Sequence, residues 1–374
     1  MAKTVVKTLQ TETLVIEETG HYVIAKKGVI DVDLAGVAGY GHGIYMGGST
    51  DGTRIDVLGR VQASLSNHTA IFLQDANARL NVGASGFAQA EAAVIVNALG
   101  TRIRNEGELR GITEGIDYYM GETDLVNGEG GMIRGQIGVR IGGDGGMMVN
   151  AGKIIGESYA VFNQSGDRLE LTNTGLLRGD VFLGNANDFF LNRGGTVDGV
   201  VKGGLGNDVF RILKHNIVVH ELGGEGQDLI QTRLSHALEV GASIEILVAL
   251  GKADIKLTGN DLNNQVIGNK GDNILSGLGG ADLISGGRGN DLLSGGEGID
   301  TFSFVNGSGR DIITDFVTGI DRLNFEHYQG VASADDLAMF QKGSDVIIEL
   351  HDGDRIVLKG QDGVNTDDFL FAIT

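Results

Sequence analysis

The chain of 374 residues contains 63 glycines, no proline and no cysteine. Without cysteine it has no disulfide, thiol nucleophile or thiolate metal ligand. Its net charge of −20, with no basic stripe visible in the sequence, makes a nucleic-acid partner unexpected. A hydrophobic content of 41% argues against a disordered chain, and no apolar run approaches the ~20 residues of a membrane span.

The N-terminal segment, residues 1–42, is expected to form a cap. Its sequence, which begins MAKTVVKTLQ, has no apolar h-region. We therefore do not expect a Sec signal peptide here.

Short strand-like runs recur at intervals of 20–27 residues over residues 43–240. Most of these intervals are 20–23 residues, which is typical of the coils of a right-handed parallel β-helix. Each such coil buries its inward residues by stacking on its neighbours. A β-sandwich of short strands is the alternative, but sandwiches rarely keep so uniform a spacing. The runs are GIYM at 43, AIFL at 70, AVIV at 93, GIDYYM at 115, GVRI at 138, AVFN at 160, DVFL at 180 and VVKG at 200.

A second marker, Asn followed by a glycine-containing turn, recurs near the end of these coils. It begins at residues 105, 150, 173 and 192, with a variant over 126–135.

Three turns spaced by 20 residues carry one aspartate each, in LGNANDFFL, GGLGNDVFR and GGEGQDLIQ. Asp188, Asp208 and Asp228 are therefore expected to stack along one edge. They either provide oxygen ligands for a hard cation such as Ca²⁺ or accept hydrogen bonds from their own turns.

Six apolar residues lie nine positions apart in the next segment, residues 241–303. They are Leu257, Val266, Leu275, Ile284, Leu293 and Phe302. The units between them follow the pattern G-G-x-G-x-D-x-U-x of calcium-binding β-rolls. A flexible Gly/Asp-rich loop is the alternative, but such a loop has no reason to keep an apolar residue in phase.

Each nine-residue unit predicts a six-residue turn followed by a three-residue strand, and two units complete an 18-residue coil. Turns two units apart then stack, so a cation between them would take Asp282 with Asp300, and Asp272 or Asn273 with Asp291. Asn264 above Asp282 is a weaker candidate because it brings no charge. Together with the three upstream aspartates, the predicted metal residues are Asp272, Asn273, Gly277, Gly279, Asp282, Gly286, Gly289, Asp291, Gly295, Gly298, Asp300, Asp188, Asp208 and Asp228.

This run resembles the RTX, or hemolysin-type, repeats of secreted bacterial proteins. The resemblance implies a parallel β-roll that binds several Ca²⁺ ions. It also implies an extracellular or cell-surface location outside a Gram-negative cell.

The C-terminal segment, residues 304–374, predicts a small antiparallel β cap with a hairpin of VIIEL and RIVL around HDGD. Its DIITDFVTGIDRLNF resembles the segment after the roll in serralysin-type C-terminal domains. Asp311, Asp315 and Asp321 either add a calcium site or are turn and surface residues. The final DDFLFAIT resembles the uncleaved signal of type I-secreted proteins, which implies the type I secretion machinery as a partner during export; it also reads as a last strand.

Catalysis is not the favoured expectation. Serralysin-type proteases need H-E-x-x-H, but His220-Glu221 is followed by Gly224 where the second His must stand, and no G-x-S-x-G elbow occurs. Mannuronan epimerases and some lyases combine a β-helix with RTX modules, so a polysaccharide-active enzyme or glycan binder is the alternative. Its candidate residues are Tyr118, Tyr119, Arg140, Asp144, Tyr159 and Arg168.

The favoured expectation is a secreted calcium-binding solenoid that serves as a surface, matrix or adhesive protein. Its partners would be further copies of itself or a cell-surface polysaccharide.

Overall fold

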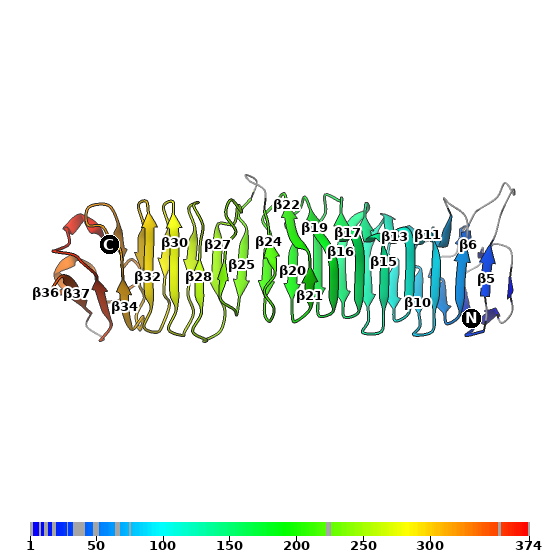
Figure 1. Ribbon diagram of the computed structural model, residues 1–374, viewed down its shortest axis with the longest axis horizontal. Coiled ribbons are helices and arrows are strands. Elements are labelled where there is room, and N and C mark those ends of the chain that lie inside the picture. Colours follow the sequence, from blue (N-terminus) through cyan, green and yellow to red (C-terminus); the bar gives the residue numbers. More distant parts are fainter. Residues whose placement is uncertain are drawn as a thin grey trace. The chain divides into compact units, whose positions relative to one another are not determined.

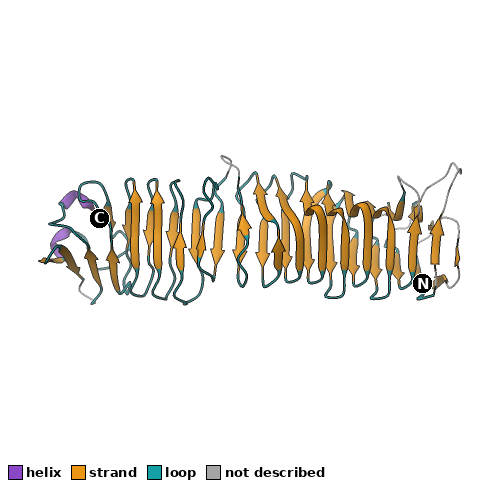
Figure 2. Ribbon diagram, in the orientation of Figure 1, coloured by secondary structure: helices purple, strands orange, loops and turns teal. Residues whose placement is uncertain are grey.

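The protein is an all-β parallel solenoid with a mixed sheet at its C-terminal end (Figures 1 and 2). The computed structural model describes residues 3–6, 9–10, 14–16, 20–27, 29–32, 42–47, 52–63, 68–74, 76–221, 226–350 and 353–372. The expected cap at 1–42, the start of the 223–231 turn, the tip of the C-terminal hairpin and residues 373–374 lie partly outside these ranges. Two compact units make up the chain, residues 1–208 and 209–374.

The first unit has two parallel sheets, so the expected parallel β-helix is confirmed and the sandwich alternative is wrong. One sheet runs in the order β1 (Lys3–Val6), β4 (His21–Ile24), β7 (Arg54–Val57), β10 (Arg79–Val82), β12 (Arg102–Asn105), β14 (Glu122–Asn127), β16 (Asp144–Asn150), β18 (Leu169–Asn173) and β20 (Phe189–Asn192).

The other sheet contains every strand-like run expected from the sequence. Its main path is β6 (His42–Met46), β9 (Thr69–Leu73), β11 (Phe87–Asn97), β13 (Glu108–Met120), β15 (Met132–Ile141), β17 (Lys153–Asn163), β19 (Leu176–Gly184) and β22 (Val200–Gly204). The shorter strands of this sheet are β2 (Leu9–Gln10), β3 (Leu14–Ile16), β5 (Val29–Val32), β8 (Arg60–Ala63) and β21 (Thr196–Asp198).

The recurring asparagine forms a buried ladder inside the first unit. The Nδ2 of Asn105 donates to Oδ1 of Asn127 at 2.8 Å, and the same contact repeats from Asn127 to Asn150 and from Asn150 to Asn173. Asn173 continues it to Asn192 at 3.3 Å. All five residues have no exposed surface, so the marker in the sequence is a stacking device in which each buried amide satisfies the next.

The second unit places the nonapeptide strands on two opposing sheets. One contains β23 (Val209–Ile212), β25 (Leu229–Thr232), β27 (Ile246–Ala249), β29 (Gln265–Ile267), β31 (Leu283–Ser285), β33 (Thr301–Ser303), β35 (Arg322–Asn324) and β39 (Phe369–Leu370). The other contains β26 (His236–Ala237), β28 (Lys256–Thr258), β30 (Ile274–Gly279), β32 (Leu292–Glu297), β34 (Arg310–Ile313), β38 (Arg355–Leu358), β37 (Asp345–Glu349) and β36 (Ala338–Lys342). A short strand, β24, spans Val218–Val219.

The 18-residue register of the roll is confirmed. Val266 pairs with Ile284, Leu275 with Leu293, and Ile284 with Phe302. All six residues that recur every nine positions are at most 1% exposed. The period of nine therefore builds one continuous apolar core that alternates between two sheets.

The C-terminal sheet is mixed. β37 pairs antiparallel with β36 and β38, as the hairpin predicts, whereas β38 pairs parallel with β34. The DDFLFAIT segment supplies β39, which pairs parallel with β35. The only helices in the described residues are two 3₁₀ turns, Ala334–Asp336 and Thr366–Asp368, drawn purple near the C-terminus in Figure 2.

Candidate metal centre

The turns of the roll depend on glycine where the backbone enters the left-handed region. Gly280, Gly289 and Gly298 stand at the fourth position of their turns with φ of +105°, +124° and +140°. At the second position Gly287 and Gly296 have φ of +89° and +109°, but Leu278 has φ of +84°. Such angles strain any residue with a Cβ. The 277–282 turn therefore stores strain that the 286–291 and 295–300 turns avoid.

The aspartate at the sixth position folds back over the first glycine of its own turn. An ideal Cβ on Gly277 would lie 1.9 Å from Oδ2 of Asp282. The corresponding distance is 2.1 Å both from Gly286 to Asp291 and from Gly295 to Asp300. The first glycine is therefore needed for space, because it leaves the volume that the carboxylate occupies.

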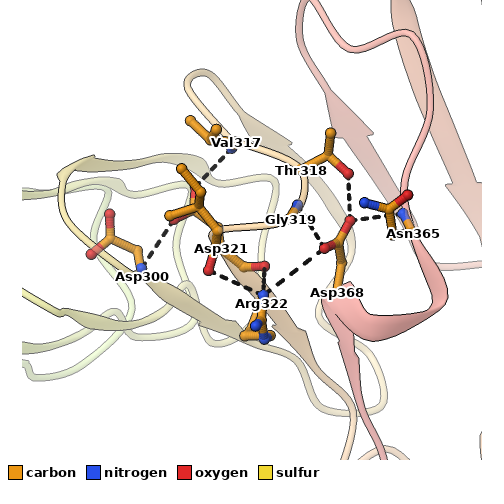
Figure 3. A network of polar contacts seen from close by, with 9 residues as sticks. Asp300, Val317, Thr318, Gly319, Asp321, Arg322, Asn365 and Asp368 are labelled. Carbon is orange, nitrogen blue, oxygen red and sulfur yellow. Dashed lines mark hydrogen bonds and ion pairs between the residues drawn. The ribbon is translucent and has the colours of Figure 1, made fainter.

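One ladder of these aspartates runs through alternate turns. The amide of Asn264 donates to Oδ1 of Asp282 at 2.7 Å, and the amide of Asp282 donates to Oδ1 of Asp300 at 2.9 Å. The amide of Asp300 donates in turn to Oδ1 of Asp321 at 3.0 Å, as Figure 3 shows. We call Asp282, Asp300 and Asp321 the first ladder.

A second ladder joins the intervening turns. The amide of Asn273 donates to Oδ1 of Asp291 at 2.7 Å, and the amide of Asp291 donates to Oδ1 of Asp311 at 2.9 Å. Asp311 therefore extends the second ladder while Asp321 extends the first, so these two aspartates belong to separate rows. We call Asp291 and Asp311 the second ladder.

Three aspartates of the roll each have one buried carboxylate oxygen without a hydrogen-bond donor among the described residues. Oδ2 of Asp282, Asp291 and Asp300 is buried and receives no hydrogen bond from any described residue. Burial raises the pKa of Asp282 to about 7 and that of Asp291 to about 6, and it also raises the pKa of Asp300. A buried carboxylate oxygen without a donor is costly, and a bound cation would satisfy it.

The asparagine turns satisfy themselves. Oδ1 of Asn264 accepts from the amide of Asn260 at 2.8 Å, and its Nδ2 donates to the carbonyl of Ile244 at 2.8 Å. Asn273 likewise accepts from the amide of Asn269 at 2.8 Å. These turns need no cation at their sixth position, in keeping with the weaker candidacy of Asn264.

Asp272 and Asn273 do different things. Asp272 is exposed, its Oδ1 accepts from the amide of Asn290 at 2.7 Å, and its own amide donates to Asp254 at 2.8 Å. It is thus part of an outer row, and Asn273 is the residue that stacks on Asp291.

The upstream aspartates stack through the same contact as the roll aspartates, in which a backbone amide donates to the carboxylate of the next coil. Oδ1 of Asp188 accepts from the amide of Leu169 at 2.6 Å, and the amide of Asp188 donates to Oδ1 of Asp208 at 2.7 Å. In the second unit the amide of Asp228 donates to Oε2 of Glu245 at 2.8 Å. Glu245 was not among the expected residues: it stands in register with Asp228, since Leu229 pairs with Ile246, but it follows Asp228 by 17 residues and not by the 20 that separate the three aspartates.

The aspartates of the cap accept hydrogen bonds from the cap itself and from the last turn of the roll. Asp354 accepts from the amides of Gly307, Ser308 and Gly309 and from the hydroxyl of Tyr328. In Figure 3, Asp368 accepts from Thr318, Gly319 and Asn365. Asp315 accepts from Ser294 and Gly295. These carboxylates fasten the cap by hydrogen bonds.

The oxygen atoms of the stacked turns form a ligand set that suits Ca²⁺. Within the described residues, no three His, Cys, Asp or Glu side chains gather into one metal cluster. A cation between stacked turns would therefore take a few carboxylate oxygens and complete its shell with turn carbonyls, which the hard, oxygen-seeking Ca²⁺ accepts. Asp282 and Asp300 would hold cations along the first ladder and Asp291 along the second. The glycine carbonyls of residues 277, 279, 286, 289, 295 and 298 are candidates to complete their shells.

The residues considered for glycan chemistry do not form one group. Tyr118 lies fully buried in the core and Tyr119 is 61% exposed. Arg140 pairs with Asp117 at 3.3 Å. Asp144 and Arg168 line a separate shallow pocket on the first unit, and Tyr159 stacks on Phe162 at 4.6 Å.

Comparison with known proteins agrees with the turn geometry. Residues 258–293 and 267–302 match the family model of the RTX calcium-binding nonapeptide repeat, so the chain carries calcium-binding RTX repeats. No curated protein matches the chain. None of the helices in the described part of the chain is long and apolar enough to span a membrane.

Two solved structures are similar to parts of the chain. The solution structure of the AlgE6R3 subunit of the Azotobacter vinelandii mannuronan C5-epimerase is 26% identical, covers 32% of this chain and 80% of its own, and has a TM-score of 0.27. The crystal structure of the extracellular lipase LipA from Serratia marcescens is 16% identical, covers 61% of this chain and 45% of its own, and has a TM-score of 0.22.

Proposed function

We propose that the protein is a secreted solenoid whose roll folds when it meets extracellular Ca²⁺. The observation that carries this proposal is the set of buried Oδ2 atoms of Asp282, Asp291 and Asp300 without a hydrogen-bond donor among the described residues. Ions between stacked turns would satisfy these oxygens and cross-link successive coils. Binding energy then becomes folding energy.

Export before folding follows from the affinity of such sites. Extracellular calcium modules typically bind at about 10⁻⁴–10⁻³ M, so the roll would stay unfolded in the cytosol. The RTX repeats support one-step type I export from a Gram-negative cell.

Removal of calcium tests the folding step. Circular dichroism in excess EGTA is expected to show loss of β-structure, and proteolysis is expected to cleave within residues 209–374 before residues 76–208. Identical spectra and identical cleavage with and without calcium would exclude metal-dependent folding.

We further propose a structural role at the cell surface or in a matrix, through contact between copies of the chain. The support is an apolar row on the outer face of the C-terminal sheet. Ile274 pairs with Leu292, Leu292 with Ile312, and Ile312 with Val357. Ile274 is 46% exposed and Leu292 is 37% exposed, and a continuous apolar row of this kind marks an interaction surface.

Light scattering and negative-stain microscopy in calcium and in EGTA test this role. We expect large assemblies in calcium that disappear in EGTA. Ile274→Thr with Leu292→Thr is expected to prevent assembly, whereas Ile299→Thr, in the 295–300 turn outside this row and 61% exposed, should not. Monodisperse protein in calcium would exclude self-assembly and favour the glycan-directed alternative.

A further inference from the structure

The first unit carries a row of arginines that the linear sequence conceals. Arg54 of β7 pairs in register with Arg79 of β10, which pairs with Arg102 of β12. Arg104 lies two residues further along β12, on the same outward face. We call these four residues the arginine stripe, and the expectation of a chain without a basic stripe is wrong for this sheet.

Stacking of parallel strands sets the spacing of the stripe. Neighbouring strands lie about 4.8 Å apart, so the backbone positions of Arg54, Arg79 and Arg102 repeat at about this interval across successive coils. Like charges so close together repel one another. The chain as a whole has a net charge of −20, whereas this row concentrates positive charge on one face of the sheet.

Internal carboxylates neutralise only part of the stripe. Arg54 pairs with Asp56 and Arg102 with Asp124, each at 2.9 Å. Neither Arg79 nor Arg104 forms an ion pair with any described residue. Two guanidinium groups therefore remain available to an external anion.

The stripe borders a shallow pocket of about 440 Å³. Its lining combines donors and acceptors: Arg54, Arg79, Asn81, Arg102, Ile103, Arg104, Asp124 and Val126. Asn81 donates to Asp56 at 2.8 Å, which holds that carboxylate beside the arginines. The surface thus offers guanidinium groups to anions and carboxylates to hydroxyl groups.

We propose that the arginine stripe binds an acidic polysaccharide laid along successive coils. Arg79 and Arg104 would bind carboxylate or sulfate groups through charge-assisted hydrogen bonds, and Asp124 would accept from sugar hydroxyls. This site lies in the first unit, outside the RTX repeats, and goes beyond the proposed calcium-dependent folding.

The mixture of charges favours a polysaccharide over a nucleic acid. A phosphodiester backbone offers acceptors to the protein, so Asp56 and Asp124 would repel it, whereas a sugar polymer brings hydroxyl donors as well as anions. Single-stranded nucleic acids also use aromatic stacking platforms, and the lining of this pocket contains no aromatic side chain among the described residues.

Fluorescence anisotropy with polymers of one backbone tests the proposal. The probes are fluorescein-labelled dextran, carboxymethyl-dextran and dextran sulfate of equal length, and a labelled oligothymidylate, all in calcium buffer. We expect salt-sensitive binding of the carboxylated or sulfated dextran, and the comparison of the two identifies the preferred anion. Neutral dextran should not bind.

Arg79→Gln with Arg104→Gln is expected to weaken binding by at least about tenfold. The matched control is Arg110→Gln with Arg193→Gln, which removes the same charge from exposed positions outside the stripe. Circular dichroism of both variants checks that they fold. Equal loss in the control, no binding of either anionic dextran, or tighter binding of the oligothymidylate would overturn the proposal.

Discussion

The carboxylate of Asp282 occupies the space that a side chain at Gly277 would need: a Cβ at residue 277 would stand 1.9 Å from Oδ2 of Asp282. Gly277→Ala should therefore push the carboxylate away from the stacked turns. We expect calcium affinity at this turn to fall by about 10–100-fold, as for loss of one charge-assisted contact. Isothermal titration calorimetry measures this change.

Gly279→Ala is the matched control, because an added Cβ there would come no closer than 3.6 Å to another atom. It keeps the carbonyl and should change affinity less than about threefold, within the usual effect of a surface substitution. If both variants bind calcium like the parent, the Asp282 carboxylate is not a ligand.

Asp282→Asn with Asp300→Asn tests whether the buried carboxylate oxygens without donors bind calcium. An amide removes the buried charge while keeping the shape, as Asn264 and Asn273 do in their own turns. We expect the melting temperature without calcium to rise and the increment on adding calcium to shrink. An unchanged calcium increment would mean that these two aspartates do not bind the ion.

Leu278 is strained at φ +84°, where the neighbouring turns use glycine. Leu278→Gly should stabilise the calcium-loaded roll by about 1 kcal/mol. Leu262→Gly is the control, since Leu262 is not among the described non-glycine residues of positive φ and its replacement should destabilise by about 0.5–1 kcal/mol. Urea unfolding in calcium distinguishes the two.

Asn150 receives an amide hydrogen bond from Asn127 and donates one to Asn173, with no exposed surface. Asn150→Ala removes the donor to the buried Oδ1 of Asn173 and one of the acceptors of Nδ2 of Asn127, and it should cost about 2–3 kcal/mol. Hydrogen exchange is expected to accelerate in β14, β16 and β18. The exposed Asn185→Ala should leave these strands protected, and equal protection in both variants would show that the ladder contributes no stability.

Periodic features of the fold could be predicted from the sequence. The nine-residue repeat specifies both the inward residue and the stacking partner, so pairs such as Leu275 with Leu293 follow from counting. The recurring asparagine was visible as well, but its role as a ladder depends on the register of buried side chains.

Features that join unequal coils could not be predicted. Arg54, Arg79 and Arg102 are separated by coils of different length, so no fixed period connects them. Asp354 reaches back to Gly307 over 47 residues through the mixed cap sheet. Likewise, only the register decides that Asn273, and not Asp272, lies above Asp291.

The pH dependence of the calcium-free protein follows from the two aspartate ladders. Burial raises the pKa of Asp282 to about 7 and that of Asp311 to about 8, above the 3.8 of an unfolded aspartate. The folded state thus binds more protons than the unfolded state between these values, so its stability is highest in acid and falls as the pH rises through about 7–8. Metal-stripped protein should melt several degrees higher at about pH 5 than at about pH 8.5, and Asp311→Asn should reduce that difference.

In saturating calcium this difference in melting temperature should shrink or reverse, because the ion competes with protons for the same carboxylates. A metal-stripped protein that melts higher at the alkaline pH would show that these carboxylates are not buried in the free roll.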